Sequence, residues 1–267
     1  MKLVGMPSPR TRPSRLRIAC VPSATERAQA SHAELAASHA FVSPEESDAI
    51  LALGGDGHML HVLHRYLPLG RPIFGMNCGT VGFLTNTYRP DGLLERFEAA
   101  TTFELHPLCM KATTTDGVVV EAMAFNEVTL FRHTGQSANV RVSVDGVERI
   151  ARFVGDGLIV ATPAGSTAYN LSAHGPIIPL GSNLLALTPV SPFRPRRWRG
   201  ALLPDAARID LANLDPAKRP LSATADVKEI LDVVSLSVRV ELATAVTLLF
   251  DPGHSLQERM AAEQFST

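Results

Sequence analysis

The stretch Asp48-Ala-Ile-Leu-Ala-Leu-Gly-Gly-Asp-Gly57 decides the fold of this chain. It begins as a nearly unbroken apolar run, which is typical of a strand buried on both faces of a parallel sheet. Glycines end the run, and apolar residues then recur at helical spacing from Met59 to Leu67 before Pro68. A buried strand that turns directly into a helix is the repeating unit of an α/β domain.

The same alternation continues on both sides of this stretch. The sequence predicts strands at Leu16–Val21 and Pro72–Met76, and helices at Ala24–His39 and Leu93–Ala100. We therefore expect an α/β nucleotide-binding domain over residues 1–104. Residues 1–15 are basic and contain prolines but lack the apolar core of a signal peptide, so we expect them to form a flexible tail.

From Leu105 onward the sequence is rich in Val and Thr, with apolar residues at every second position. Val140, Val142 and Val144 followed by Asp145-Gly146 predict a hairpin, and Asp116-Gly117 predicts a second one. Residues 232–250 indicate further strands. We therefore expect a β-rich domain over residues 105–251, with a helical segment within 252–267 packing back onto the first domain.

Composition excludes several classes of protein. The chain has 267 residues, is 45% hydrophobic and carries a net charge of -1, so it can bury two cores but lacks the basic surplus of a nucleic-acid binder. No apolar run reaches the length that spans a membrane. Three cysteines, Cys20, Cys78 and Cys109, form no Cys-x-x-Cys pair, which favours reduced thiols in a cytoplasmic protein over disulfides or structural zinc.

The glycine turn after the central strand is the first candidate site. Gly54, Gly55 and Gly57 allow backbone amides to approach a phosphate without side chains in the way. Ligands of open α/β sheets bind at this edge. Asp56 is unusual there, because a carboxylate repels phosphate; it is explained if it handles a hydroxyl proton or bridges through a metal ion. A plain Asp-Gly turn is the alternative.

Three histidines follow on the predicted helix, namely His58, His61 and His64. Steps of three residues advance by roughly 300° each, so these side chains spread over about 120° of the helix surface. That spread is too wide for one metal ion, and we expect no metal site here. His61 is placed to point toward a ligand held at Asp56.

A second glycine-rich stretch, Gly75 to Leu84, follows the next strand. Its spacing is Gly-x-x-x-Gly-x-x-Gly, with Gly79 and Gly82 after Gly75, and departs from the Gly-x-Gly-x-x-Gly of hydride-transfer Rossmann sites. Phe83 beside these glycines suits either a base that stacks on its ring or the protein core.

Polar residues inside an apolar strand mark a third region. Asn126 and Glu127 lie within Ala124–Leu130 and need partners, from either a ligand or a backbone network.

The segment Gly155–Pro176 then runs from a strand into a turn, where Ser166 and Thr167 are expected to cap a helix that carries Tyr169 and Ser172. Hydroxyls, amides and an aromatic ring suit a ribose and an adenine. Ser166 is not a nucleophile of the Gly-x-Ser-x-Gly type, because alanines occupy both glycine positions.

Together these segments resemble the NAD kinase family. The matching stretches, in the same order, are Leu53–Gly57, Gly75–Leu84, Asn126-Glu127, Gly155–Gly157 and Thr162–Tyr169. The resemblance covers about residues 16–250 and implies a two-domain fold, similar to that of diacylglycerol kinases, with an α/β N-terminal domain, a β-rich C-terminal domain and NAD held between them. It also implies a cytoplasmic homodimer or homotetramer.

The resemblance further implies a kinase that transfers the γ-phosphoryl group of ATP to the 2'-hydroxyl of the adenosine ribose of NAD, giving NADP. A divalent metal ion, Mg²⁺, is implied, held mainly by the nucleotide phosphates. Asp56 is implied as the proton acceptor. The expected NAD-binding residues are Asp56, Gly57, His61, Phe83, Asn126, Glu127, Asp156, Ala164, Thr167, Ala168, Tyr169, Asn170, Leu171 and Ser172. The expected phosphate or donor loop comprises Gly54, Gly55, Gly57 and Gly79.

Two segments depart from the family pattern. His174 stands where the family commonly has glycine, and Ser191–Gly200 replaces a Pro-His-x-Leu-x-x-Arg-Pro pattern. Four arginines around Trp198 in this second segment contact phosphates, or form a solvated loop or a subunit contact, and charge runs favour the latter.

Two other functions remain as alternatives. A lipid kinase of the diacylglycerol or sphingosine type would need a basic amphipathic surface helix, which the sequence lacks. A non-catalytic NAD(P) sensor would have no need of a carboxylate beside phosphate.

Overall fold

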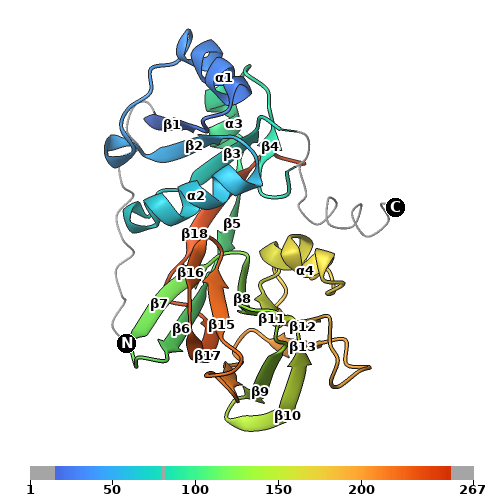
Figure 1. The fold of residues 1–267 in the computed structure, drawn as a ribbon. Coiled ribbons are helices and arrows are strands. Elements are labelled where there is room, and N and C mark those ends of the chain that lie inside the picture. Colours follow the sequence, from blue (N-terminus) through green and yellow to red (C-terminus); the bar gives the residue numbers. More distant parts are fainter. Residues whose placement is uncertain (1–15, 80–81, 254–267) are drawn as a thin grey trace, which may run out of the picture. The chain divides into compact units, whose positions relative to one another are not determined.

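The computed structural model describes residues 16–79 and 82–253, which form two compact units (Figure 1). The first unit holds the described residues up to Thr102 together with Leu248–Pro252, and the second holds Phe103–Thr247. The first is α/β and the second is β-rich, so the predicted fold class is confirmed. The chain returns to the first unit at Leu248; the predicted tail and residues 254–267 lie outside the described residues.

The first unit is built on a sheet of order β1-β2-β3-β18-β5, with β4 beside β3. The strands of this sheet are β1 (Ile18–Pro22), β2 (Ala49–Leu53), β3 (Ile73–Asn77), β4 (Asn86–Thr87), β5 (Thr101–Leu105) and β18 (Val246–Phe250). The boundaries between the units at Thr102 and Leu248 fall within β5 and β18. Its helices are α1 (Glu26–Ala36), α2 (Asp56–Tyr66) and α3 (Leu93–Ala99), with short 3-10 turns η1 (Pro44–Glu46) and η2 (Leu67–Leu69). The pairs β1–β2, β2–β3 and β3–β18 are parallel, and every residue of β2 is buried, as its apolar run predicts.

The assignment of all of residues 232–250 to the second domain is wrong for β18. This strand pairs with β3, because Leu248 and Leu249 continue the buried apolar surface of the first sheet. A run of apolar residues predicts a strand but carries no information about which sheet the strand joins.

Asp251 anchors the end of β18 inside the first unit. Its carboxylate accepts hydrogen bonds from Arg96 Nε at 2.9 Å, Arg96 Nη2 at 2.7 Å and Arg89 Nη2 at 3.1 Å. Its backbone N–H donates to Asn86 Oδ1 at 2.9 Å. Burial favours the neutral acid, but the two arginines outweigh it and lower the pKa of Asp251.

The second unit consists of two antiparallel sheets of order β10-β9-β14-β17-β6-β7 and β13-β12-β11-β8-β15-β16. The strands of the first are β6 (Leu108–Thr114), β7 (Val119–Ala124), β9 (Ala138–Val144), β10 (Val147–Gly155), β14 (Ile209–Asn213) and β17 (Val233–Val240). Those of the second are β8 (Glu127–Arg132), β11 (Gly157–Ala161), β12 (Leu184–Val190), β13 (Ala201–Pro204), β15 (Leu221–Ala225) and β16 (Lys228–Ile230). A 3-10 turn η3 (Ala164–Thr167) and the short helix α4 (Tyr169–Ser172) follow β11.

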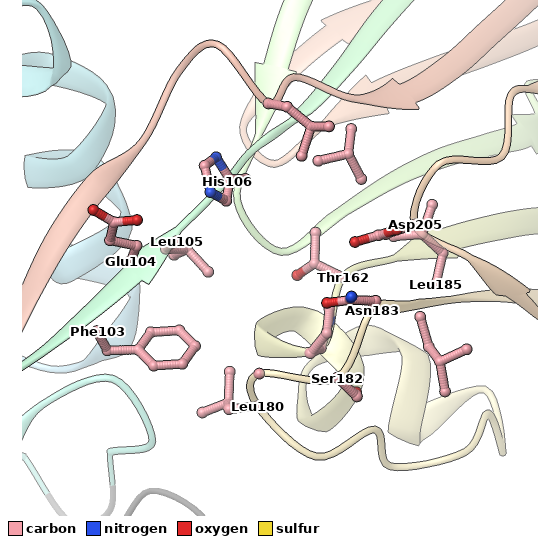
Figure 2. A pocket seen from close by; sticks show the side chains of 15 residues that line it. Phe103, Glu104, Leu105, His106, Thr162, Leu180, Ser182, Asn183, Leu185 and Asp205 are labelled. Carbon is pink, nitrogen blue, oxygen red and sulfur yellow. The ribbon is translucent and has the colours of Figure 1, made fainter. Parts of the chain in front are cut away.

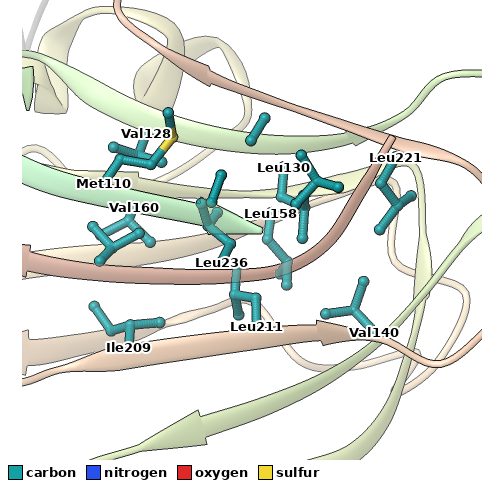
Figure 3. Close-up of a cluster of buried hydrophobic side chains, with 14 of the residues drawn as sticks. Met110, Val128, Leu130, Val140, Leu158, Val160, Ile209, Leu211, Leu221 and Leu236 are labelled. Atoms are coloured by element: carbon teal, nitrogen blue, oxygen red, sulfur yellow. The ribbon is translucent and has the colours of Figure 1, made fainter. Parts of the chain in front are cut away.

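One apolar cluster draws on both sheets of this unit (Figure 3). Met110 and Leu211 come from one sheet, and Val128 and Leu158 come from the other; all four side chains are buried. Both predicted hairpins are confirmed: β9 and β10 pair across Asp145-Gly146, and β6 and β7 pair across Asp116-Gly117. Asp145 and Gly146 both have positive φ, as an Asp-Gly hairpin turn requires.

Candidate functional site

The glycine turn of the first unit lies where β2 meets α2. Gly55 is the N-cap of α2, with φ -87°, and Asp56 is its first residue. The free N–H groups and the partial positive charge of a helix start suit a phosphate. A Cβ atom on Gly55 or Gly57 would meet no atom of the described residues within 4 Å, so packing among these residues does not explain the two glycines. Room for a ligand close to the backbone does explain them.

Contacts within the protein explain why Gly54 and Gly79, which are also expected in the phosphate loop, are glycines. A Cβ on Gly54 would lie 2.7 Å from the Cβ of His58, whose Nε2 lies 2.9 Å from the Val21 carbonyl oxygen. Gly79 donates its N–H to Asn77 Oδ1 at 2.6 Å. These two glycines shape the turns, whereas Gly55 and Gly57 leave space open.

The Asp56 carboxylate organises the second glycine stretch. Its Oδ2 accepts the N–H of Phe83 at 2.7 Å, and its Oδ1 accepts the N–H of Leu84 at 3.1 Å. A Cβ on Gly82 would collide with Thr85 and lie 3.0 Å from Asp56 Oδ1, so glycine is required for this approach. The structure thus brings Asp56 and Phe83 together, and it does so through the backbone of Phe83, which the sequence analysis missed.

The three histidines lie on α2, as the sequence predicts. His61 is exposed, while Met59, Leu60, Val62 and Leu63 on the same helix are buried. Within 16–79 and 82–253, no group of three or more His, Cys, Asp or Glu side chains is arranged to hold a metal ion.

Asn126 and Glu127 form the polar centre of the second unit, at the start of β8. Asn126 Oδ1 and Glu127 Oε2 are buried, and neither has a hydrogen-bond partner among the described residues. The backbone is satisfied instead: the N–H groups of Phe125, Asn126 and Glu127 donate to the Asp226 carboxylate at 2.6, 3.0 and 3.2 Å. Buried side-chain acceptors without partners are rare, and a ligand that donates hydrogen bonds would complete them.

Burial raises the pKa of Glu127 to about 8, and the charge of Asp226 adds to this shift. At neutral pH most of the Glu127 carboxyl groups therefore carry a proton. A neutral carboxyl group both donates and accepts hydrogen bonds, and it does not repel a phosphorylated ligand.

The turn after β11 packs against this pair. Thr162 Oγ1 donates to the Phe125 carbonyl oxygen at 2.7 Å and accepts the N–H of Gly165 at 3.0 Å. A Cβ on Gly165 would collide with the carbonyl oxygen of Asn126, so only glycine permits this contact. The structure therefore brings η3, with Ala164 and Thr167, beside Asn126 as the sequence motif implied.

The expected capping role of Ser166 and Thr167 is wrong, because neither η3 nor α4 has a side-chain cap. Ser166 Oγ donates to the Pro163 carbonyl oxygen at 2.7 Å and accepts the N–H of Ile178 at 3.0 Å. Asn170, expected to contact NAD, is fully buried: its Nδ2 donates to Ser166 and Pro176 carbonyl oxygens, and its Oδ1 accepts the Thr188 hydroxyl. The structure thus places Ser166 and Asn170 in the support of the turn.

Tyr169 and Asp156 share an open cavity of about 530 Å³. The Tyr169 ring is 44% exposed and lies 5.7 Å from the Phe131 ring, measured between centroids. Asp156 pairs with Arg132, which the sequence analysis did not connect to this site. The register of the sheet explains this ion pair: β8 and β11 are antiparallel neighbours, which brings Arg132 beside Asp156 at the start of β11.

The structure describes the backbone at both segments that depart from the family pattern. His174 has φ +61°, which explains why a glycine is common at this position. Phe193 and Arg194 bond to the Val154 carbonyl oxygen through their N–H groups, and the four arginine side chains of this segment are exposed.

Comparison with known proteins decides the family. Residues 13–102 match the ATP-NAD kinase N-terminal domain, and residues 125–254 match the ATP-NAD kinase C-terminal domain. The chain belongs to the NAD kinase family. It is 54% identical to the NAD kinase of Xylella fastidiosa (strain 9a5c) over 94% of this chain and 96% of that protein. It is 52% identical to the NAD kinase of Caulobacter vibrioides over 90% and 92% of the two chains.

Solved structures of NAD kinases have the same fold. An NAD kinase from Archaeoglobus fulgidus in complex with ATP is 25% identical, with a TM-score of 0.73 over 93% of this chain and 98% of that one. Yeast NADH kinase complexed with NADH is 23% identical, with a TM-score of 0.73 over 85% of this chain and 70% of that one, and shares the fold. These matches give no support to the lipid-kinase and sensor alternatives. Across 16–79 and 82–253, the helices are too short or too polar to span a membrane.

Proposed function

We propose that this chain transfers the γ-phosphoryl group of ATP to the 2'-hydroxyl of the adenosine ribose of NAD, with Asp56 accepting the hydroxyl proton. As a member of the NAD kinase family, the chain phosphorylates NAD to NADP with ATP as co-substrate. The observation that carries the detailed proposal is the start of α2, where a carboxylate stands between glycines whose backbone faces open space. Phosphoryl transfer asks mainly for positioning and charge neutralisation, and amides at a helix start provide both.

The NAD site is centred on Asn126 and Glu127. Their unpartnered oxygens suit the hydroxyl groups of a ribose or the amino group of adenine, which are hydrogen-bond donors. Thr167 and Tyr169 follow on the adjoining turn and helix, with a hydroxyl group and an exposed ring. The further NAD contacts in this proposal are Gly57, His61, Phe83, Asp156, Ala164, Ala168, Leu171 and Ser172.

A divalent metal ion fits this chain as an ion held mainly by the nucleotide phosphates. Both oxygens of Asp56 already accept backbone N–H groups, and within 16–79 and 82–253 no cluster of side chains forms a protein cage for a metal. When bound, Mg²⁺ would neutralise charge on the transferred phosphoryl group. In this proposal the protein contributes two things to the reaction. Asp56 accepts the hydroxyl proton, and the backbone amides of Gly55 and Gly57 bind the phosphates. A cytoplasmic homodimer or homotetramer completes the proposal, and light scattering measures the subunit number.

A coupled assay tests the role of Asp56. The protein is mixed with NAD, ATP and Mg²⁺, and NADP is read with an NADP-specific dehydrogenase. Asp56→Asn should lower kcat by about 10²–10⁴-fold, which is the range for loss of general base catalysis. Asp116→Asn changes another Asp-Gly turn, between β6 and β7, and should leave kcat unchanged.

NAD binding and melting temperature of Asp56→Asn separate chemistry from folding, because Asn places an amide N–H where Asp56 accepts from Phe83 or Leu84. A variant that melts and binds NAD like the wild type but turns over slowly supports the proposal. Near-normal turnover removes Asp56 from the mechanism.

A further inference from the structure

A second cavity, of about 150 Å³, is lined by residues from within the range Phe103–Thr247 (Figure 2). None of the residues proposed to bind NAD or ATP lines it. Its walls come from the segment where the chain enters this unit (Phe103–His106), from Val240 and Leu242 near the exit, and from the loop between α4 and β12 (Leu180–Leu185).

The walls of this cavity are largely apolar. Leu105, Leu180 and Leu185 are buried, and Phe103 contributes a ring. Leu242, at its edge, is 64% exposed. An apolar cavity of ~150 Å³ is large enough for a molecule the size of benzene.

Most polar groups in the cavity are already used within the protein. Thr162 Oγ1 bonds to Phe125 and Gly165, His106 Nδ1 lies 2.9 Å from the Thr244 carbonyl oxygen, and Ser182 Oγ donates to the Pro179 carbonyl oxygen at 2.6 Å. These groups set the shape of the cavity and leave few positions to bind a ligand.

Asp205 is the carboxylate that faces the cavity. It is half-buried, and Figure 2 places its carboxylate on the side of the cavity where Asn183 lies. Glu104 is exposed, and in Figure 2 its carboxylate points away from the side on which Phe103 and Leu105 lie. Within the part of the chain that the structure describes, Asp205 forms no ion pair, and no Lys or Arg lines the cavity. The cavity therefore combines apolar walls with one carboxylate that no Lys or Arg pairs.

We propose that this cavity binds a small organic cation, namely a primary amine carried on an apolar ring of roughly six to ten heavy atoms. The ring is buried among the leucines and Phe103, and the ammonium group pairs with Asp205. The same carboxylate repels phosphates, so NAD and ATP are not ligands here. Because Thr162 and Pro163 line the cavity and lead into η3, the amine lies against the turn that carries Ala164 and Thr167.

Ligand-observed NMR on the full chain, without substrates, tests this proposal with benzylamine, benzyl alcohol and benzoate. These probes share a ring and differ in charge. Benzylamine should bind with a dissociation constant on the order of 0.1–1 mM, which is usual for a ligand of this size. Benzyl alcohol should bind at least tenfold more weakly, and benzoate should not bind.

Two variants test the carboxylate of the cavity. Asp205→Asn should weaken benzylamine binding by about tenfold. Glu104→Gln changes an exposed carboxylate that points away from the cavity, so it is the matched control and should bind like the wild type.

Absence of benzylamine binding, equal binding of the alcohol, or unchanged binding in Asp205→Asn would overturn the proposal. Kinase activity measured on the same samples keeps this result separate from the proposed function, since amine binding does not depend on turnover.

Discussion

Two carboxyl groups of this molecule, one buried and one half-buried, have opposite surroundings. Asp251, in the first unit, is 1% exposed and accepts hydrogen bonds from two arginines, which lower its pKa. Glu127, in the second unit, has a buried oxygen with no hydrogen-bond partner among the described residues, and burial raises its pKa to about 8. The first group is charged and satisfied by the fold; the second is mostly neutral and unsatisfied.

This difference distinguishes polar groups that stabilise the fold from polar groups that are available to a ligand. A buried polar group that the protein itself satisfies contributes to the stability of one conformation. A buried group left unsatisfied costs stability, and the chain retains it where a ligand completes the bonds. On this criterion Asp251 holds β18 in its sheet, and Glu127 fits the role proposed for it in binding the dinucleotide.

Breaking the Asp251 network should have the largest effect on stability. Asp251→Asn removes the charge that balances Arg96, whose side chain is 9% exposed, and an uncompensated buried charge costs about 3–5 kcal/mol. Chemical denaturation measures the loss in the free energy of unfolding. Asp48→Asn is the control, because its partner Arg17 is 54% exposed and such surface pairs contribute at most about 1 kcal/mol. Equal losses in the two variants would contradict the structural role of Asp251.

Gly165→Ala should have the next largest effect, because it disturbs the backbone beside Glu127. The added methyl group collides with the carbonyl oxygen of Asn126 and should cost about 1–3 kcal/mol of stability, as overpacking does. NAD affinity should fall with it, since Asn126 must move. Gly135→Ala is the stability control, because a Cβ there meets nothing within 4 Å and should change the free energy of unfolding by about 0.5 kcal/mol or less. An unaffected melting temperature in Gly165→Ala would show that the turn is not packed as described.

The pH dependence of stability tests Glu127 directly. Its folded pKa, about 8, lies above its ordinary value of 4.5, so the folded state binds more protons between these pH values. The contribution is fully present below pH 4.5 and is lost as pH rises through about 8, with a slope of up to about 1.4 kcal/mol per pH unit. Glu127→Gln should flatten the profile of melting temperature between pH 5 and 8, as measured in matched buffers.

Glu121→Gln is the control for that experiment, because Glu121 is an exposed residue paired with Lys111. Its profile should follow the wild type. A wild-type profile that already rises with pH, with no difference in Glu127→Gln, would show that Glu127 is charged in the folded state.

Local patterns predicted much of the fold. The apolar run of β2, the helical spacing in α2 and both Asp-Gly hairpins are properties of neighbouring residues, and the structure has them where expected. The family motif also located the unsatisfied pair Asn126-Glu127. These features follow from periodicity and turn chemistry, which act over a few residues.

Contacts between distant residues could not be predicted in the same way. Asp226 binds the backbone of Phe125–Glu127 from about a hundred positions away, and nothing in the residues around it indicates this partner. Asn170 looked like a ligand contact from its place in the motif, and only the register of β12, which brings Thr188 to it, shows that its amide is used internally. The sheet that β18 joins depends likewise on tertiary packing.

Gly55→Ala should have the smallest effect on stability. In the phosphate loop it tests whether a glycine is retained for the fold or for a ligand. Gly55 has φ -87° and ψ -175°, which alanine adopts freely, and a Cβ there meets no described atom within 4 Å. The free energy of unfolding should therefore change by about 0.5 kcal/mol or less. If the open space holds a phosphate of ATP, however, the methyl group occupies part of it, and kcat/KM for ATP should fall at least about tenfold.

Gly54→Ala, one residue earlier, is the matched variant with the opposite expectation for stability, because its Cβ meets the side chain of His58 at 2.7 Å. A stable Gly55→Ala protein with normal ATP kinetics would place the phosphates elsewhere. A stable protein with weakened ATP use would show that this glycine is retained for the ligand and not for the fold, as inferred for the unsatisfied oxygen of Glu127.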